Sequence, residues 1–144
     1  MIIQLPGNAS PSPDPIRDLL RSSKTIAVVG LSSNPRRPSH DVASYLQRAG
    51  YKIVPVNPNE SEVLGEKSYP RLEDIPFPID IVDVFRRPEE ILPVADSAIA
   101  IHAKALWLQQ GIINAEAAAK AHAAGLLVVQ DACLFVEHKR RVPL

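Results

Sequence analysis

Residues 25–39 read TIAVVGLSSNPRRPS, and this stretch decides how the rest of the chain is interpreted. The β-branched run from Ile26 to Val29 is typical of a strand buried on both faces, and it ends at Gly30. Small polar residues, two arginines and a Pro-Ser pair that can open a helix follow. A strand, a loop with backbone N–H groups and a helix N-terminus together suit a phosphate group. The stretch therefore predicts an α/β domain with a nucleotide phosphate site after its first strand.

The composition limits the class of protein. A chain of 144 residues suits one domain with a single core, and its net charge of zero gives no overall attraction to nucleic acid or a membrane surface. The single cysteine, Cys133, excludes an internal disulfide framework and favours a reducing compartment. The first 15 residues lack the pattern of a signal peptide, and no run approaches the ~20 apolar residues of a bilayer span. We expect a cytoplasmic protein without a membrane or nucleic-acid partner.

Strands and helices alternate along most of the chain. The sequence predicts strands at 26–29, 52–56, 79–85, 105–109 and 126–130, with helices at 39–49, 88–100 and 114–125 and a short basic helix near the end. Residues 1–15, rich in Pro and Ser, are expected to form a flexible arm that ends where Asp14-Pro15 opens a short helix. Residues 16–144 are expected to form a single domain.

The predicted fold is a Rossmann-like, doubly wound parallel sheet of five strands with helices on both faces, because parallel strands need crossover connections. Among the topologies with right-handed crossovers, we expect the strand order 3-2-1-4-5. In that order strands one and four are neighbours, so the loops after Gly30 and Gln109 would flank one crevice. Trp107, inside strand four, is expected in the core rather than against a ligand.

A standard NAD site fits this chain poorly. The dinucleotide fingerprint G-x-G-x-x-G is represented by Gly30 alone, and a phosphate-binding P-loop is absent. The second strand ends in Val56-Asn57-Pro58, where NAD binding expects an acid for the ribose.

A different anion pocket is predicted instead. Ser32, Ser33 and Asn34 can offer donors to a pyrophosphate, Ser39 can cap the following helix, and His40 lies close behind the loop.

Arginines supply the positive charge of this pocket. Arg36 and Arg37 follow the first strand, and Arg86 and Arg87 follow the third, so all four are expected at one edge of the sheet. Guanidinium groups match phosphate oxygens well. This much charge suits a ligand with more phosphate charge than a plain pyrophosphate.

The chain resembles a known family, the small CoA-binding proteins of the YccU type, which are similar to the CoA-binding domain of succinyl-CoA synthetase alpha subunits. The resemblance covers residues 23–138. The segments that carry it are AVVGLSSNPRRPSHDVASYLQRAGY (27–51), IVPVNP (53–58), LGEKSYPRLEDIP (64–76), IDIVDVFRRPEE (79–90) and LWLQQGIINAEAAAKAHAAGLLVVQDAC (106–133).

The resemblance implies a Rossmann-like fold that binds coenzyme A. The diphosphate would lie on the loop from Gly30 to Asn34, and the adenosine with its 3′-phosphate near Val56-Asn57-Pro58 and the arginines. Phe85-Arg86-Arg87 would line the opposite side. Two departures stand out. Unlike succinyl-CoA synthetases, the chain is expected to carry no second domain with a phosphorylated histidine, and it has Asp131-Ala132-Cys133 where the family commonly has Asp-Arg-Cys.

Three functions remain open at this point. The first is a non-catalytic protein that binds coenzyme A or acyl-CoA, because no catalytic triad or metal-ligand spacing is visible. The second is the CoA-binding subunit of an acyl-CoA ligase or transferase whose catalytic half is a separate protein partner. The third is an NAD(P)-binding redox protein with a degenerate loop.

Overall fold

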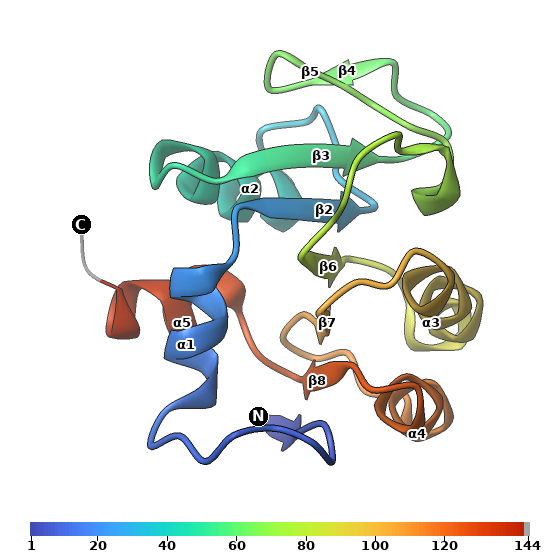
Figure 1. The fold of residues 1–144 in the computed structure, drawn as a ribbon. Helices are drawn as coiled ribbons and strands as arrows, with labels where there is room; N and C mark the ends of the chain where they lie inside the picture. Colours follow the sequence, from blue (N-terminus) through green and yellow to red (C-terminus); the bar gives the residue numbers. More distant parts are fainter. Residues whose placement is uncertain (143–144) are drawn as a thin grey trace.

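A six-stranded sheet lies between two layers of helices (Figure 1). This computed structural model describes residues 1–142. The strand order is β1-β8-β7-β6-β2-β3, and every neighbouring pair is parallel except β1 and β8. The strands are β1 (Ile2–Gln4), β2 (Thr25–Val29), β3 (Lys52–Val56), β6 (Ile81–Val84), β7 (Ala105–Leu108) and β8 (Leu127–Gln130).

Five α-helices cover the sheet. They are α1 (Pro15–Ser22), α2 (Pro38–Arg48), α3 (Ile91–Ala100), α4 (Ala115–Ala123) and α5 (Leu134–Arg141). Helices α1, α2 and α5 share one core cluster with one face of the sheet, and α3 and α4 share another with the opposite face. The irregular stretch after β3 holds a small hairpin and a 3₁₀ turn, and a second such turn leads into α3: β4 (Glu62–Val63), β5 (Glu66–Lys67), η1 (Leu72–Asp74) and η2 (Pro88–Glu90).

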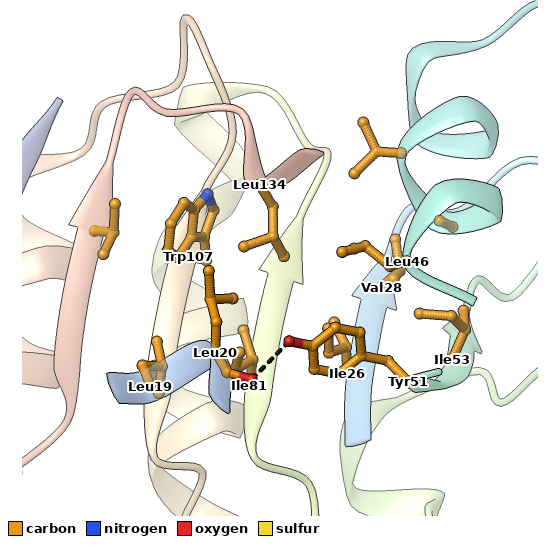
Figure 2. Close-up of a cluster of buried hydrophobic side chains, with 14 of the residues drawn as sticks. Leu19, Leu20, Ile26, Val28, Leu46, Tyr51, Ile53, Ile81, Trp107 and Leu134 are labelled. Atoms are coloured by element: carbon orange, nitrogen blue, oxygen red, sulfur yellow. Dashed lines mark hydrogen bonds between the residues drawn. The ribbon is translucent and has the colours of Figure 1, made fainter. Parts of the chain in front are cut away.

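The core on the α1, α2 and α5 side combines aliphatic and aromatic side chains (Figure 2). Trp107 is fully buried there, as expected, and its Nε1 donates to the carbonyl oxygen of Ala132 at 2.9 Å. The hydroxyl of Tyr51 likewise donates to the carbonyl oxygen of Leu20 at 2.6 Å. Both polar groups thus enter the core without an unsatisfied donor, which would cost free energy there.

The expected α/β class, with a mostly parallel sheet covered on both faces, is confirmed, but the strand order 3-2-1-4-5 is wrong. Counted along the five predicted strands, the observed order is 2-1-3-4-5, and β1 adds a sixth, antiparallel strand. Both orders obey right-handed crossovers, and a hydrophobic pattern does not say on which side of β2 the chain returns. The switch point therefore lies between β2 and β6, so the loop after Phe85, rather than the one after Gln109, faces the Gly30 loop.

The amino end of the chain contains a strand that the sequence did not indicate. Ile2 and Ile3 pair with Gln130 and Val129 of β8, inside the segment expected to be an arm. The flexibility of residues 1–15 and the division at residue 16 stay predictions. None of the helices in residues 1–142 combines the length and apolarity needed to cross a membrane.

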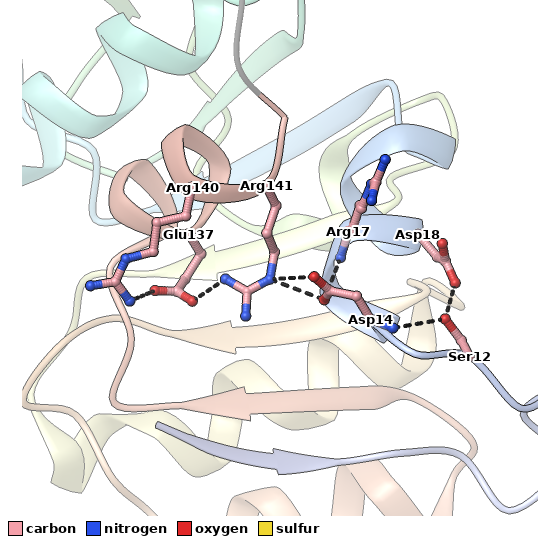
Figure 3. A network of polar contacts seen from close by, with 7 residues as sticks. All are labelled: Ser12, Asp14, Arg17, Asp18, Glu137, Arg140 and Arg141. Carbon is pink, nitrogen blue, oxygen red and sulfur yellow. Dashed lines mark hydrogen bonds and ion pairs between the residues drawn. The ribbon is translucent and has the colours of Figure 1, made fainter.

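Arg141, the last residue of the basic run 139–141, makes ion pairs with two acids (Figure 3). Arg141 ends α5, and its Nε lies 3.0 Å from Oδ1 of Asp14, the residue that caps α1 by accepting from the N–H of Arg17. The same guanidinium pairs with Glu137, whose side chain is only 7% exposed. Arg141 therefore joins the start of α1 to the end of α5.

Replacing Arg141 by alanine should destabilise the fold by about 2 kcal/mol, because it leaves the buried carboxylate of Glu137 with one weaker partner. Urea unfolding measures this change. The matched control is Arg140→Ala, since Arg140 pairs with the same carboxylate at 3.6 Å but is 71% exposed. The control should stay within about 0.5 kcal/mol of the wild type. Equal, small losses of unfolding free energy in both variants would show that the contacts of Arg141 between α1 and α5 do not stabilise the fold.

Candidate functional site

A cleft of about 610 Å³ opens at the carboxyl edge of the sheet, at the switch point between β2 and β6. Ligands of open α/β sheets bind at such points. The loops that follow β2, β3, β6 and β7 all contribute to its walls. The lining residues are Gly30, Ser32, Arg37, Pro38, Ser39, Asn57, Phe85, Arg86, Arg87, Pro88, Glu90 and Ile112.

Gly30 lets the loops converge. Its φ is +88°, and a Cβ at this position would lie 2.4 Å from the carbonyl oxygen of Phe85. Its N–H donates to the carbonyl oxygen of Val56 at 2.8 Å, and the N–H of Phe85 donates to that of Val29 at 2.9 Å. The glycine is therefore required by the close approach of the β6 end, with or without a ligand.

The loop after Gly30 satisfies its own backbone N–H groups, which the sequence led us to expect as phosphate donors. The N–H of Ser32 donates to Oγ of Ser39 at 3.1 Å, and the N–H of Asn34 donates to Oγ of Ser32 at 3.0 Å. The N–H of Arg36 donates to Oδ1 of Asn34 at 3.0 Å. These bonds hold the loop in one shape, and the hydroxyl protons of Ser32 and Ser39 remain for a ligand.

One expected role in this loop needs correction, and one expected donor is engaged by a carboxylate. Ser39 is the second residue of α2 and does not cap it, because the helix begins at Pro38 with Arg37 in the cap position. The N–H of Ser33 donates to Oε2 of Glu60 at 2.7 Å, and this hydrogen bond lowers the pKa of Glu60. An internal carboxylate therefore already occupies the donor of Ser33.

The three arginines that line the cleft differ in whether their guanidinium groups form ion pairs with acidic side chains. Arg87 forms ion pairs with Glu89 at 3.6 Å and with Glu90 at 3.0 Å, and the hydrogen bond between Arg87 and Glu90 raises the pKa of the former and lowers that of the latter. Arg37 and Arg86 make no ion pair within residues 1–142. Arg37 and Arg86 are thus the cations that the cleft offers to an anion.

A second hollow of about 310 Å³ shares Arg86 with the cleft. Its walls are mostly aliphatic and come from β2, β3, the η1 region and α3. They comprise Val29, Val56, Pro58, Pro70, Arg71, Leu72, Arg86, Pro93, Val94 and Ser97. The side chain of Arg86 therefore stands where a polar cleft and an apolar hollow meet.

The predicted site residues separate into three groups. Gly30, Ser32, Arg37, Ser39, Asn57, Phe85, Arg86 and Arg87 line the cleft, Val56 and Pro58 line the second hollow, and Ser33, Asn34, Arg36, His40 and Gln109 line neither. Gln109 is buried, and its Nε2 donates to Oδ1 of Asp83 at 2.6 Å. It misses the cleft because β6 lies between β2 and β7.

Four lining residues were not anticipated: Pro38, Pro88, Glu90 and Ile112. A signal for the prolines exists in the sequence, because Arg-Arg-Pro occurs both at 36–38 and at 86–88, each time between a strand and a helix. The structure places these two loops on opposite sides of the switch point. Ile112 is brought in by a turn in which its N–H donates to the carbonyl oxygen of Gln109 at 2.9 Å.

Metal coordination finds no support in the part of the chain that the structure describes. Within it, no three His, Cys, Asp or Glu side chains gather in a way that would hold an ion.

Comparisons with known proteins identify the family to which this chain is related. Residues 24–139 match the model of a family described as a CoA binding domain. The uncharacterized protein YneT of Bacillus subtilis is 46% identical over 129 residues, which is 90% of this chain and 96% of YneT. A hypothetical protein from Pyrococcus horikoshii, of known structure, is 39% identical with a TM-score of 0.88 over 99% of both chains.

A third relative is an enzyme. An ADP-forming acetate–CoA ligase II of Archaeoglobus fulgidus is 37% identical over 80 residues, which are 54% of this chain but 12% of the ligase.

Gly30→Ala should destabilise the protein by about 3 kcal/mol or more, because the new methyl group meets the carbonyl oxygen of Phe85 in a backbone conformation unfavourable to alanine. Gly125→Ala is the matched control. Gly125 also has a positive φ, +96°, but no atom lies within 4 Å of a Cβ there, so its cost should be about 1 kcal/mol. Thermal and urea unfolding measure both, and equal costs would show that the approach of Phe85 is not limiting.

Proposed function

Because the chain belongs to the CoA binding domain family, we propose that it binds coenzyme A or an acyl-CoA at the switch-point cleft and performs no chemistry of its own. The observation that carries the proposal is the pair of Arg-Arg-Pro loops, which bring the unpaired cations Arg37 and Arg86 to one cleft. This gives the site positive charge although the whole chain is neutral.

The diphosphate is assigned to the polar part of the cleft. Guanidinium groups of Arg37 and Arg86 give charge-assisted hydrogen bonds to phosphate oxygens. The hydroxyls of Ser32 and Ser39 add donors, and α2 begins at the same place, so its dipole favours an anion there.

The adenine is assigned to the second hollow. Pro58, Leu72 and Val94 give this hollow apolar walls suited to a flat base, and Arg86 at its edge can reach phosphates attached to that nucleoside. This agrees with the expectation that the adenosine lies near Val56-Asn57-Pro58. The apolar part of the cleft, Phe85, Pro88 and Ile112, is then left for the pantetheine arm.

We propose that the protein is not a catalyst because of the side chains that line the cleft. The titratable side chains among the residues that line the cleft are the three arginines and Glu90, whose carboxylate pairs with Arg87. These groups serve binding rather than proton transfer, which needs a group poised near the working pH.

A cytoplasmic location also stays a prediction.

A second candidate follows from the likeness to the ligase. The chain matches 12% of that enzyme, and in an analogous reaction a protein partner would supply the parts of the ligase that the match does not cover. This candidate keeps the same site and adds a partner.

Calorimetric titration tests the proposal. Coenzyme A should bind with a micromolar or tighter dissociation constant, and dephospho-CoA should bind more weakly because it lacks the phosphomonoester that surplus arginine would hold. Arg86→Met should weaken binding about tenfold or more through the loss of charged hydrogen bonds. The matched control is Arg36→Met, since Arg36 lies outside the cleft and its loss should change affinity less than about threefold.

Each result has a clear reading. No binding of coenzyme A would overturn the proposal, and equal affinity for the two ligands would remove the role of the 3′-phosphate. NADH serves as the competing ligand, and tighter binding of NADH would favour a redox protein instead.

Glu90→Gln should strengthen coenzyme A binding about threefold, because it removes a negative charge from the cleft and frees the guanidinium of Arg87. Glu89→Gln is the control: Glu89 pairs with the same arginine at 3.6 Å but does not line the cleft, so its effect should be smaller. Titration at low and high salt separates direct contacts between charged groups and the ligand from the longer-range attraction of the cleft, because salt screens the latter more strongly. Weaker binding by the Glu90 variant would mean that the carboxylate itself contacts the ligand.

A further inference from the structure

Asp83 is an acid in an unusual place. It lies in the middle of the sheet on β6, with Val28 of β2 and Trp107 of β7 as its neighbours across the strands. All three residues are fully buried. By the alternation along β6, its side chain shares the face of Ile81, which belongs to the apolar core under α1, α2 and α5.

The carboxyl group has one partner, and that partner is neutral. Oδ1 accepts from Nε2 of Gln109 at 2.6 Å, and Oδ2 has no hydrogen-bond partner in the described part of the chain. No ion pair within residues 1–142 includes Asp83. Burial raises the pKa of Asp83 to about 7, and the hydrogen bond from Gln109 opposes this only in part.

The other titratable groups on this face are engaged elsewhere. His138 of α5 shares a hydrogen bond of 2.8 Å with the hydroxyl of Tyr45 of α2, and Glu137 of α5 pairs with Arg141. The hydroxyl of Tyr51 donates to the backbone of α1. Cys133, before α5, is half-buried. None of them offers a positive charge to Asp83, so an ionised carboxylate there would be uncompensated.

We propose that Asp83 carries a proton up to neutral pH and forms a neutral acid–amide pair with Gln109, which fixes the ends of β6 and β7 beneath the cleft. In this pair the acid hydroxyl donates to the amide oxygen of Gln109, and the amide N–H donates to the other carboxyl oxygen. Oδ2 of Asp83, which is otherwise buried without a partner, then has one.

The pair lies directly below two walls of the cleft. Phe85 and Arg86 come two and three residues after Asp83, just past the end of β6, and Ile112 ends the turn that begins at Gln109. The N–H of Gln109 also donates to the carbonyl oxygen of Val84 at 3.3 Å. Asp83 is thus a positioning residue: its ionisation draws water toward the buried carboxylate, loosens these strand ends and weakens ligand binding. This last step rests on the proposed function.

The sign of the pH effect follows from the direction of the shift. An unfolded aspartate titrates near pH 4, whereas the folded one keeps its proton to about pH 7, so unfolding releases a proton between these values. The contribution of Asp83 to stability therefore falls as the pH rises through this window and is level above it. Asp83→Asn keeps a neutral donor at the same place and removes the titration.

Thermal unfolding from pH 5 to pH 8 tests the pair. The melting temperature of Asp83→Asn relative to the wild type should rise by roughly 5–10 °C across this range. Asp80→Asn is the matched control, because hydrogen bonds from the N–H groups of Lys24 and Thr25, opposed by partial burial, lower the pKa of Asp80. Its difference from the wild type should be constant. A constant difference for Asp83→Asn as well would overturn the proposal.

Infrared spectra of the wild type with ¹³C-labelled aspartate give a readout that does not depend on a variant folding. One protonated carboxyl band should be present at pH 6 and disappear near neutrality, and its absence at pH 6 would overturn the proposal.

The effect on the cleft is measured with dephospho-CoA, since the phosphomonoester of coenzyme A itself titrates near pH 6. Its affinity should fall about threefold from pH 6 to pH 8 in the wild type and stay constant in Asp83→Asn. A constant wild-type affinity would remove the link to the cleft. If dephospho-CoA and coenzyme A do not bind at all, the proposed function fails, while melting and infrared data still decide the acid–amide pair.

Discussion

The close approach of the carbonyl oxygen of Phe85 to the side of Gly30 where a Cβ would stand sets the geometry on which the site depends. Because residue 30 has no side chain, the end of β6 can pass within 2.4 Å of the place a Cβ would take. The ends of β2, β3 and β6 are then joined by backbone hydrogen bonds, and each carries its loop to the same edge. The close approach of these two strand ends does not depend on a ligand, and it brings Arg37 and Arg86 to the same cleft.

Local charge, rather than overall charge, characterises the cleft. The chain has 16 basic and 16 acidic residues, and several of its surface charges form ion pairs, such as Arg71 with Asp74 and Lys120 with Asp96. Three carboxylates bond to the loops that carry the arginines: Glu60 accepts from the N–H of Ser33, and Glu89 and Glu90 pair with Arg87. The positive charge left for a ligand is therefore concentrated on Arg37 and Arg86. Such a site attracts anions over a short range without making the whole protein basic.

The sequence predicted the elements well and their arrangement less well. The strand at 52–56 and the helix caps at Asp14 and Asn114 follow from residues close in the chain, and all three are confirmed. The strand order does not follow from local pattern, since β6 can join either edge of the β2–β3 pair without changing any hydrophobic period. This one choice moved Gln109 from the cleft to the core and brought Glu90 into the cleft. β1 was missed because three residues carry too little pattern to predict a strand.

Two buried acids, Glu137 and Asp83, differ in their partners and in their distance from the cleft. Glu137 is buried between two arginines at the end of α5, far along the chain from the arginine loops, and its charge is compensated. Asp83 lies beneath the cleft with an amide as its one partner. A fold that needed only stability at this position would be served by an aliphatic side chain, as at Val28 and Ile81 on the same face. An acid kept there without a cation makes the ends of β6 and β7 sensitive to protonation, at the point where those strands support the site.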